Sequence, residues 1–154
     1  MRVVIQRVNC AKVLVDDKVM GAIGAGVVLL VAVTPGDTQC QADWLAQKIA
    51  GLRIFPAIDG SSGFDRSLID IHGGALVVSQ FTLYGEIRNG RRPDFVNAAR
   101  SEIAAPLIDR FLLMLSSAGV TQVSTGLFGA HMRIVLENDG PVTLILDSPL
   151  KGAT

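Results

Sequence analysis

Residues 75–85 read ALVVSQFTLYG and place a buried strand near the middle of the chain. The run from Ala75 to Val78 is apolar without a break and follows two glycines, a pattern typical of a strand that is buried on both faces. The polar residues Ser79, Gln80 and Thr82 stand at its end. Buried polar groups need hydrogen-bond partners, so these side chains either satisfy neighbouring backbone groups or face a ligand. The stretch alone leaves both interpretations open.

Further strands and two helices are predicted on either side of this segment. Apolar runs between Gly, Pro and Asp residues indicate strands, and apolar residues at helical spacing indicate helices. We therefore expect an α/β mixed (α+β-like) fold, in which mixed and antiparallel β-sheets form a barrel-like core with two main helices packed on it. The predicted strands are 2–8, 11–15, 19–23, 27–33, 53–55, 75–78, 121–125, 132–137 and 142–146, and the predicted helices are 39–52 and 103–117.

The composition fits one compact domain. The chain has 154 residues, of which 49% are hydrophobic, and this is enough to bury a sizeable core. No repeat or linker divides it, so residues 1–154 are predicted to form a single domain, with 147–154 as a loose tail. The formal net charge is zero, so no overall field attracts the protein to nucleic acid or to an anionic membrane. This argues against a general nucleic-acid coat protein but not against an enzyme that binds one end of an RNA, and any contact with RNA must come from a local patch.

Neither a metal site nor a disulfide framework is indicated. The two cysteines, Cys10 and Cys40, lack the spacing of metal ligands and are typical of reduced thiols in the cytosol. No apolar signal segment follows the start of the sequence, and no apolar run approaches the roughly 18 residues that a membrane helix needs. We therefore expect a soluble, cytoplasmic protein with no metal, no cofactor and no membrane partner.

Three arginines lie within five positions of a glycine-containing loop: Arg88, Arg91 and Arg92. They are the densest positive charge in the chain. A guanidinium fork matches the oxygens of a phosphate group, so this loop is a candidate phosphate-binding site. The alternative is a solvated surface loop.

Residues 138–143 read NDGPVT and lie between the last two predicted strands. Gly140-Pro141 is a turn signal, which fits an ordinary hairpin. A cis peptide costs little free energy before a proline, and about 5–6% of X-Pro bonds in folded proteins are cis. A cis bond here would fix two carbonyl groups in place, and Gly140 has no side chain to cover them.

Two motifs together resemble those of the D-aminoacyl-tRNA deacylases, a homodimeric family that proofreads chirality: Ser79-Gln80-Phe81-Thr82 and Asn138-x-Gly140-Pro141-Val142-Thr143. The similarity covers nearly the whole chain, and two functional motifs at the expected separation make it highly specific. One segment departs from the family pattern, because residues 61–66 read SSGFDR where a Lys-Met-Asn type segment is usual. The flanking matches are Val-Ile-Gln6-Arg7-Val, Arg53-Ile-Phe-Pro, Gly90-x-Arg92-Pro93-x-Phe95 and Gly126-x-Phe128-Gly-Ala.

The resemblance implies both an activity and a set of roles. The activity is hydrolysis of the ester bond of D-aminoacyl-tRNA, and of glycyl-tRNA mischarged on tRNA(Ala), by a homodimer that needs no cofactor and does not act on DNA. The implied roles are a catalytic pocket for the 3′-terminal adenosine and its amino acid (Ser79, Gln80, Phe81, Thr82), chiral selection by a Gly-cisPro element that enters the partner subunit's pocket (Gly140, Pro141), and support for that element (Arg7, Asn138, Thr143). For an enzyme that acts on tRNA, the charge of Arg88, Arg91 and Arg92 predicts tRNA binding.

The mechanism is less determined than the activity. The only histidines, His72 and His131, lack the flanking signature of a Ser-His-Asp hydrolase, and no Gly-x-Ser-x-Gly elbow is present. We therefore prefer catalysis in which backbone N–H groups near Phe81 and Thr82 stabilise the oxyanion and the 2′-hydroxyl of the RNA helps the water, over a covalent Thr82 mechanism. Two other functions stay open: a small-molecule esterase that uses Ser79 or Thr82 with a histidine, and a non-enzymatic RNA-end-binding module.

Overall fold

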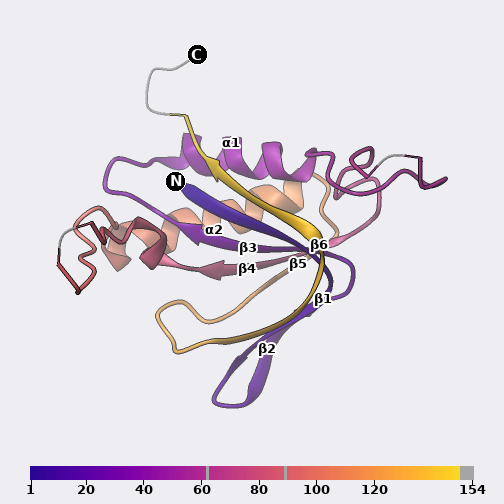
Figure 1. Cartoon of the computed structure of the whole chain (residues 1–154). Coiled ribbons are helices and arrows are strands. Elements are labelled where there is room, and N and C mark those ends of the chain that lie inside the picture. Colours follow the sequence, from indigo (N-terminus) through magenta and orange to yellow (C-terminus); the bar gives the residue numbers. More distant parts are fainter. Residues whose placement is uncertain (62, 89, 150–154) are drawn as a thin grey trace.

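Figure 1 presents the computed structural model, which describes residues 1–61, 63–88 and 90–149. Three strands open the chain, and the two main helices are separated by one strand and followed by two more. The elements are β1 (Arg2–Val15), β2 (Lys18–Ile23), β3 (Gly26–Ala32), α1 (Gln39–Ala50), β4 (Gly74–Ser79), the 3-10 helix η1 (Phe81–Tyr84), α2 (Ser101–Ser117), β5 (Gln122–Thr125) and β6 (Arg133–Asp147).

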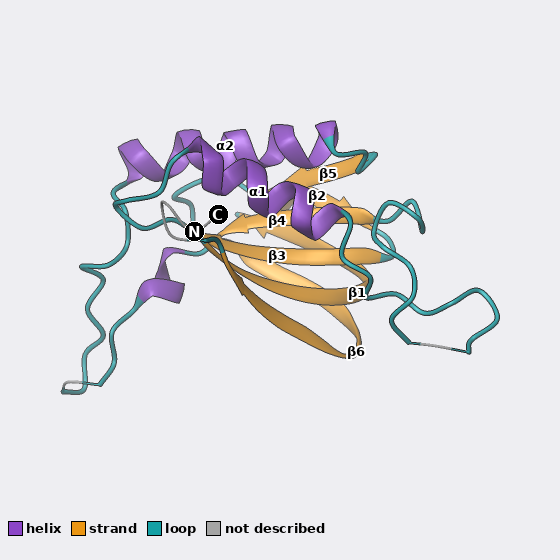
Figure 2. Cartoon of the chain, turned by 90° about the horizontal axis from the view of Figure 1, so that it is seen from above, coloured by secondary structure: helices purple, strands orange, loops and turns teal. Residues whose placement is uncertain are grey.

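The described strands form one mixed sheet. Its order is β2-β1-β3-β4-β5, and β6 pairs with β1 in addition. β1 is antiparallel to β2, β3 and β6, whereas β4 is parallel to both β3 and β5. Parallel neighbours require crossover connections, and α1 and α2 supply them on the same face of the sheet (Figure 2). The prediction of a mixed α/β domain with two main helices is confirmed.

β4 is buried on both faces, as its unbroken apolar sequence predicts. Ala75 and Val77 belong to the core between the sheet and the helices, while Leu76 and Val78 belong to a second apolar cluster. Because side chains alternate along a strand, this second cluster lies on the opposite face of the sheet. Ser79, at the end of the strand, is its only half-buried residue.

The sheet curls until β2 and β5 meet. The side chains of Gln122 and Ser124 on β5 donate to the carbonyl oxygen of Ala22 on β2, at 3.2 and 3.1 Å. A Cβ at Gly21 would come within 2.7 Å of the carbonyl oxygen of Thr125, so the close approach requires a glycine there. The curled sheet surrounds the second apolar cluster, which confirms the predicted barrel-like core.

The two helices pack on the sheet through one apolar face each. Leu45 on α1 and Phe111 on α2 are fully buried in the shared core. The backbone N–H of Thr38 donates to the side-chain oxygen of Gln41 at 2.8 Å, which satisfies one of the free donors at the start of α1. No described helix has the length and the apolar character that crossing a membrane would demand.

β6 corrects the prediction for the end of the chain. The two expected strands, 132–137 and 142–146, form a single 15-residue strand that pairs with β1. Residues 138–143 therefore lie within a strand and not in a hairpin turn. The pairing shifts register between Gln6 and Val8, and again between Val8 and Cys10, and an edge strand tolerates a proline at such an irregularity.

The predicted tail is also held more firmly than expected. Asp147 is the last residue of β6, and the backbone N–H of Ser148 donates to the carbonyl oxygen of Met1 at 2.9 Å. The prediction of a loose tail is therefore wrong for its first two residues. Residues 150–154 lie outside the described part of the chain.

β6 exposes apolar side chains on both of its faces. Leu144 and Ile145 are sequence neighbours and so point to opposite faces, yet they are 38% and 69% exposed. Val135 and Leu136, nearer the start of the strand, are exposed in the same way. A long edge strand with exposed apolar residues is a ready template for pairing with another chain.

Candidate active site

The end of β4 leads directly into the η1 turn. The backbone N–H of Gln80 donates to the carbonyl oxygen of Val31 at the end of β3, at 2.8 Å, and this bond fixes the point where the strand stops. The side-chain amide of Gln80 then donates to the hydroxyl oxygen of Thr82. Gln80 and Thr82, which follow the buried strand, therefore bond each other, and Ser79 just before them is half-buried.

Two backbone donors at the start of η1 have no acceptor within the described residues. These are the N–H groups of Phe81 and Thr82. No side chain caps the turn, and no backbone carbonyl of the described residues accepts from either group. The first N–H groups of a helix lack partners inside the helix. The next amides are satisfied: Leu83 donates to the carbonyl of Gln80 at 3.2 Å and Gly85 to that of Thr82 at 2.9 Å. Adjacent donors are thus available for an oxygen atom of a ligand.

A cavity of about 450 Å³ lies at the carboxyl ends of β3 and β4. Its volume is within the usual range for small-molecule sites. Among the described residues that line it, His131 carries the only titratable side chain. The walls are the end of β3 (Val31, Ala32, Val33), the end of β4 with the turn (Val78, Ser79, Gln80, Phe81), α2 and the residues before it (Ala99, Ser101, Ala104, Ile108), and residues 128–132 with Ile134.

Phe81 connects this cavity to the arginine loop, residues 86–95. The rings of Phe81 and Phe95 meet edge to face, with centroids 5.0 Å apart and an interplanar angle of 71°. The loop folds back on itself through backbone bonds between Glu86 and Asp94. A Cβ at Gly85 would come within 3.0 Å of the Phe95 ring, so glycine permits this contact.

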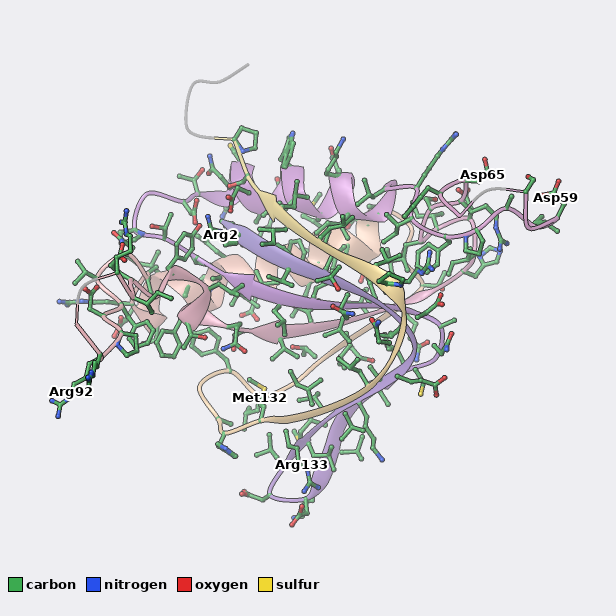
Figure 3. The ribbon with its side chains drawn as sticks, viewed as in Figure 1. Arg2, Asp59, Asp65, Arg92, Met132 and Arg133 are labelled. Carbon is green, nitrogen blue, oxygen red and sulfur yellow. The ribbon has the colours of Figure 1, made fainter. Side chains whose placement is uncertain are left out.

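The three arginines of the loop differ in their surroundings. Arg88 forms a fork-shaped ion pair with Glu86, and this hydrogen-bonded contact lowers the pKa of the Glu86 carboxyl to about 2. Arg91 and Arg92 are exposed and form no ion pair with any described residue. Arg92 lies at the outer tip of the loop, away from the body of the protein (Figure 3).

Gly140-Pro141 sits in a second cluster of polar residues on β6 and β1. The peptide bond between the two residues is cis. The side-chain amide of Gln6 donates to the Asn138 side-chain oxygen, and the hydroxyl of Thr143 donates to the Gln6 side-chain oxygen at 2.7 Å. Gln6 therefore links Asn138 and Thr143, which stand two positions before Gly140 and two after Pro141.

Arg7 braces the same cluster from the other side. Its Nε donates to the carbonyl oxygen of Asp139 at 3.1 Å and lies 2.9 Å from the Asp139 carboxylate. Its Nη1 donates to the carbonyl oxygens of Ile54 and, at 3.4 Å, of Gly63. A buried guanidinium needs such partners, and Arg7 is only 9% exposed. The segment that departs from the family pattern thus contacts Arg7 through Gly63.

The cavity and the Gly140-Pro141 cluster do not meet within one chain. The register places Gly140-Pro141 opposite Arg7, which is level with Val27 and Ala75. Ser79 is four residues further along β4, about 13 Å, and β4 is three strands away from β6, about 14 Å across the sheet. Figure 1 places the bend of β6 at one end of the sheet and the tip of β4 at the other.

The structure sorts the predicted site residues into three groups. Ser79, Gln80 and Phe81 line the cavity, whereas Thr82, the next residue, is exposed and does not line it. Arg7, Asn138 and Thr143 surround Gly140-Pro141, and the arginines form a separate loop. Sequence reasoning missed the opposite wall of the cavity, which includes Phe128, His131 and Met132. The signal was the segment Gly126-x-Phe128-Gly-Ala, which carried a resemblance but no assigned role.

His72 is far from this cavity. It lies two residues before β4 begins, with a positive φ of 50°. Ser79 is at the other end of the same strand, about 16 Å away along its length. A catalytic pairing of His72 with Ser79 is therefore excluded by distance, and His131 is the only histidine that a serine-based mechanism could use.

Comparison with known proteins identifies the family. The model of the family described as D-Tyr-tRNA(Tyr) deacylase matches residues 4–147. The chain belongs to this family. A D-aminoacyl-tRNA deacylase of Roseiflexus sp. (strain RS-1) is 56% identical over 150 residues, which cover 97% of this chain and 95% of that protein. One of Thermomicrobium roseum is 54% identical over 148 residues, covering 96% and 94%.

A solved structure of another protein has the same fold as this chain. The structure named c-Myc DNA Unwinding Element Binding Protein superposes with a TM-score of 0.91 at 36% identity, and covers 97% of this chain and 100% of that chain. Membership in the deacylase family confirms the resemblance found in the sequence. It makes the protein a hydrolase that acts on the ester bond of aminoacyl-tRNA, and so argues against the non-enzymatic RNA-end-binding module.

Proposed function

We propose that this deacylase cleaves the ester between a D-amino acid and the 3′-terminal ribose of tRNA in the cavity at the end of β4. The observation that carries the proposal is the pair of backbone N–H groups, at Phe81 and Thr82, that have no acceptor beside this cavity. The half-exposed ring of Phe128 also lines the cavity, and an aromatic face of this kind suits the base of the terminal adenosine. Because the substrate is charged tRNA, we expect the protein to work in the cytoplasm.

The proposed reaction needs little side-chain chemistry. The oxygen of a water molecule adds to the ester carbonyl carbon, and the carbonyl oxygen takes up negative charge. The bond from that carbon to the ribose oxygen then breaks as the carbonyl forms again, and the ribose oxygen receives the proton that the water gives up. The N–H groups of Phe81 and Thr82 stabilise the oxyanion, and the loss of one such donor typically costs about 10²–10³ in rate. The amides need no activation, which fits a cavity whose lining has no carboxylate among the described residues.

The surroundings of Thr82 favour water as the nucleophile over a covalent mechanism. The hydroxyl oxygen of Thr82 accepts a hydrogen bond from Gln80, and no described side chain accepts the proton of that hydroxyl. A hydroxyl group needs an adjacent base to become a nucleophile. We therefore assign the orientation of the water to the 2′-hydroxyl of the terminal ribose.

The selection of chirality requires a second chain in this proposal. Gly140-Pro141 lies too far from the cavity of its own chain to reach it, and the exposed apolar faces of β6 suit a twofold interface between two copies. In the pair, the carbonyl groups of Gly140 and Pro141 from the partner would hold the substrate amino group. They would leave no space on the side where an L side chain must point.

Glycine should escape this rejection, because it has no side chain on either face. In an assay with matched D-, L- and glycyl-tRNA, we expect the wild-type protein to cleave the D- and glycyl-esters, including glycine on tRNA(Ala), and to leave the L-ester intact. The His131→Ala variant should retain this activity within a few-fold. Efficient cleavage of L-esters would remove the rejection model.

The same experiment tests the one alternative that the structure still favours. His131 and Ser79 line the same cavity, so a small-molecule esterase with a serine nucleophile and a histidine base is a second candidate. A general base contributes about 10²–10⁴ to the rate. If His131→Ala lost that much activity and the protein hydrolysed free amino-acid esters, the esterase would be the better assignment.

The arginine loop is proposed to hold phosphates of the tRNA, with most of the effect from Arg91 and Arg92. Replacing both by alanine should flatten the salt dependence of tRNA binding, by about one unit of slope for each lost contact. Fluorescence anisotropy of labelled tRNA between 50 and 200 mM salt, roughly the range in which this effect is large, measures the slope.

Arg88→Ala is the matched control for this loop. Its guanidinium is already paired with Glu86, so we expect a smaller change of slope than for either neighbour. An unchanged slope in the Arg91/Arg92 double variant would assign the loop to plain solvent exposure.

A further inference from the structure

The η1 turn is short and exposed. It has four residues, and none of them is buried. Besides the bond inside the helix, the backbone bonds from Leu83 to Gln80 and from Gly85 to Thr82 close its two ends. A short exposed turn of this kind opens easily, although it carries the two N–H groups on which the proposed reaction depends. The start of the turn is held by the Gln80 bond to Val31 and by the Phe81–Phe95 contact, and its second half needs contacts of its own.

Arg2, at the start of β1, contacts the second half of this turn. Its Nη1 donates to the carbonyl oxygen of Leu83 at 3.3 Å, and its guanidinium carbon lies 5.3 Å from the centre of the Tyr84 ring. Figure 3 places Arg2 at the edge of the sheet where β1 starts and β6 ends. One guanidinium thus touches two consecutive residues of η1.

Asp147, the last residue of β6, fixes the orientation of that guanidinium. Its two carboxylate oxygens accept hydrogen bonds from Nε and Nη2 of Arg2, at 2.7 and 2.9 Å. A guanidinium is planar, so a bidentate pair of this kind sets both its plane and the direction of the remaining nitrogen. The remaining nitrogen, Nη1, is the one that bonds Leu83.

We propose that Arg2 is a positioning residue for the deacylase reaction, which holds η1 so that the N–H groups of Phe81 and Thr82 face the ester. This inference rests on the proposed function of those two groups. The backbone of Arg2 pairs with Ala32, which lines the cavity. The arginine side chain contacts Asp147, Leu83 and Tyr84, none of which lines the cavity, and so acts through the turn. A misplacement of about 1 Å in a catalytic group can cost on the order of 10²-fold in rate, so a loosened turn affects turnover far more than tRNA binding.

The test compares Arg2→Ala and Arg2→Lys with Arg110→Ala. Arg110 forms the same two-point pair with Asp43, at 2.7 and 2.8 Å, and is exposed to a similar degree, but it joins α1 to α2 away from η1. We expect Arg2→Ala to lower kcat for D-aminoacyl-tRNA at least about tenfold with KM nearly unchanged. Arg2→Lys, which keeps one donor but not the fork, should fall between Arg2→Ala and the wild type. Arg110→Ala should retain kcat.

Hydrogen exchange of the turn gives a readout that needs no substrate. The amides of Leu83 and Gly85 should exchange faster in Arg2→Ala than in Arg110→Ala, while the amides of β4 stay equally protected in both. Equal exchange in the two variants, or an unchanged kcat in Arg2→Ala, would overturn the inference. If instead the wild type did not hydrolyse D-aminoacyl-tRNA, the proposed function would fail, while the exchange rates would still decide whether Arg2 orders the turn.

Discussion

Replacing Gly140 by alanine should lower the turnover of D-aminoacyl-tRNA by on the order of 100-fold, because a methyl group would stand where the partner chain meets the substrate. A Cβ on Gly140 would also come within 2.4 Å of the Asn138 side-chain nitrogen and 3.1 Å of the Val142 backbone nitrogen. Asn138 would have to move, and its bond with Gln6 would be lost. The measurement is the rate of D-tyrosine release from charged tRNA.

Gly24→Ala is the matched control for this substitution. A Cβ on Gly24 would meet nothing within 4 Å, so this variant should hydrolyse the substrate at the wild-type rate. Light scattering and a melting curve on the Gly140→Ala protein would separate a local obstruction from loss of the fold. Wild-type turnover in a folded Gly140→Ala protein would contradict the role given to this residue.

A charge on β6 should separate the two copies and remove most of the activity. Ile145 is 69% exposed in the single chain, and Ile145→Glu would place a carboxylate in the proposed interface. Burying an unpaired charge costs several kcal/mol, so the dissociation constant of the pair should rise by at least about 100-fold. We expect a monomer in light scattering, with slow hydrolysis and a ratio of D- to L-ester cleavage near unity.

Ile58→Glu controls for the charge itself. Ile58 is even more exposed, at 89%, and lies in the loop after α1, away from β6. This variant should stay paired and active. If Ile145→Glu remained paired and fully selective, the interface would have to involve another surface. If it became monomeric and kept its selectivity, Gly140-Pro141 would not act across chains.

The sequence predicts the central part of the fold because there the local pattern and the burial agree. The unbroken apolar run from Ala75 to Val78 has both faces in apolar clusters, and the helical spacing in 39–52 and 103–117 marks the two helices within two residues at each end. In β6 the local sequence pattern and the pairing of the strand disagree. Gly140-Pro141 is locally a turn signal, but pairing with β1 keeps the chain extended on both sides of it, and a local pattern contains no information on that partner.

Without the resemblance, which pointed to Arg7, the candidate site could be predicted only where its residues are consecutive. Ser79, Gln80 and Phe81 lie together in the sequence and line the cavity together. The opposite wall comes from residues 128–132, about fifty positions later, and only the folded chain brings the two together. Asp139 and Gln6 were not predicted as site residues for the same reason: Asp139 bonds Arg7, and Gln6 bonds Asn138 and Thr143, and both contacts depend on the register between β1 and β6.

The distance between the η1 turn and Gly140-Pro141 has a consequence for the protein at low concentration. If the stereochemical filter comes from another copy, fidelity belongs to the assembled pair and obeys mass action. A single subunit, diluted below the dissociation constant of the pair, would keep the cavity and the η1 turn but would lack the partner's Gly140-Pro141, which distinguishes D- from L-esters in this proposal. A cell that makes very little of this enzyme would therefore gain from tight association more than from fast chemistry.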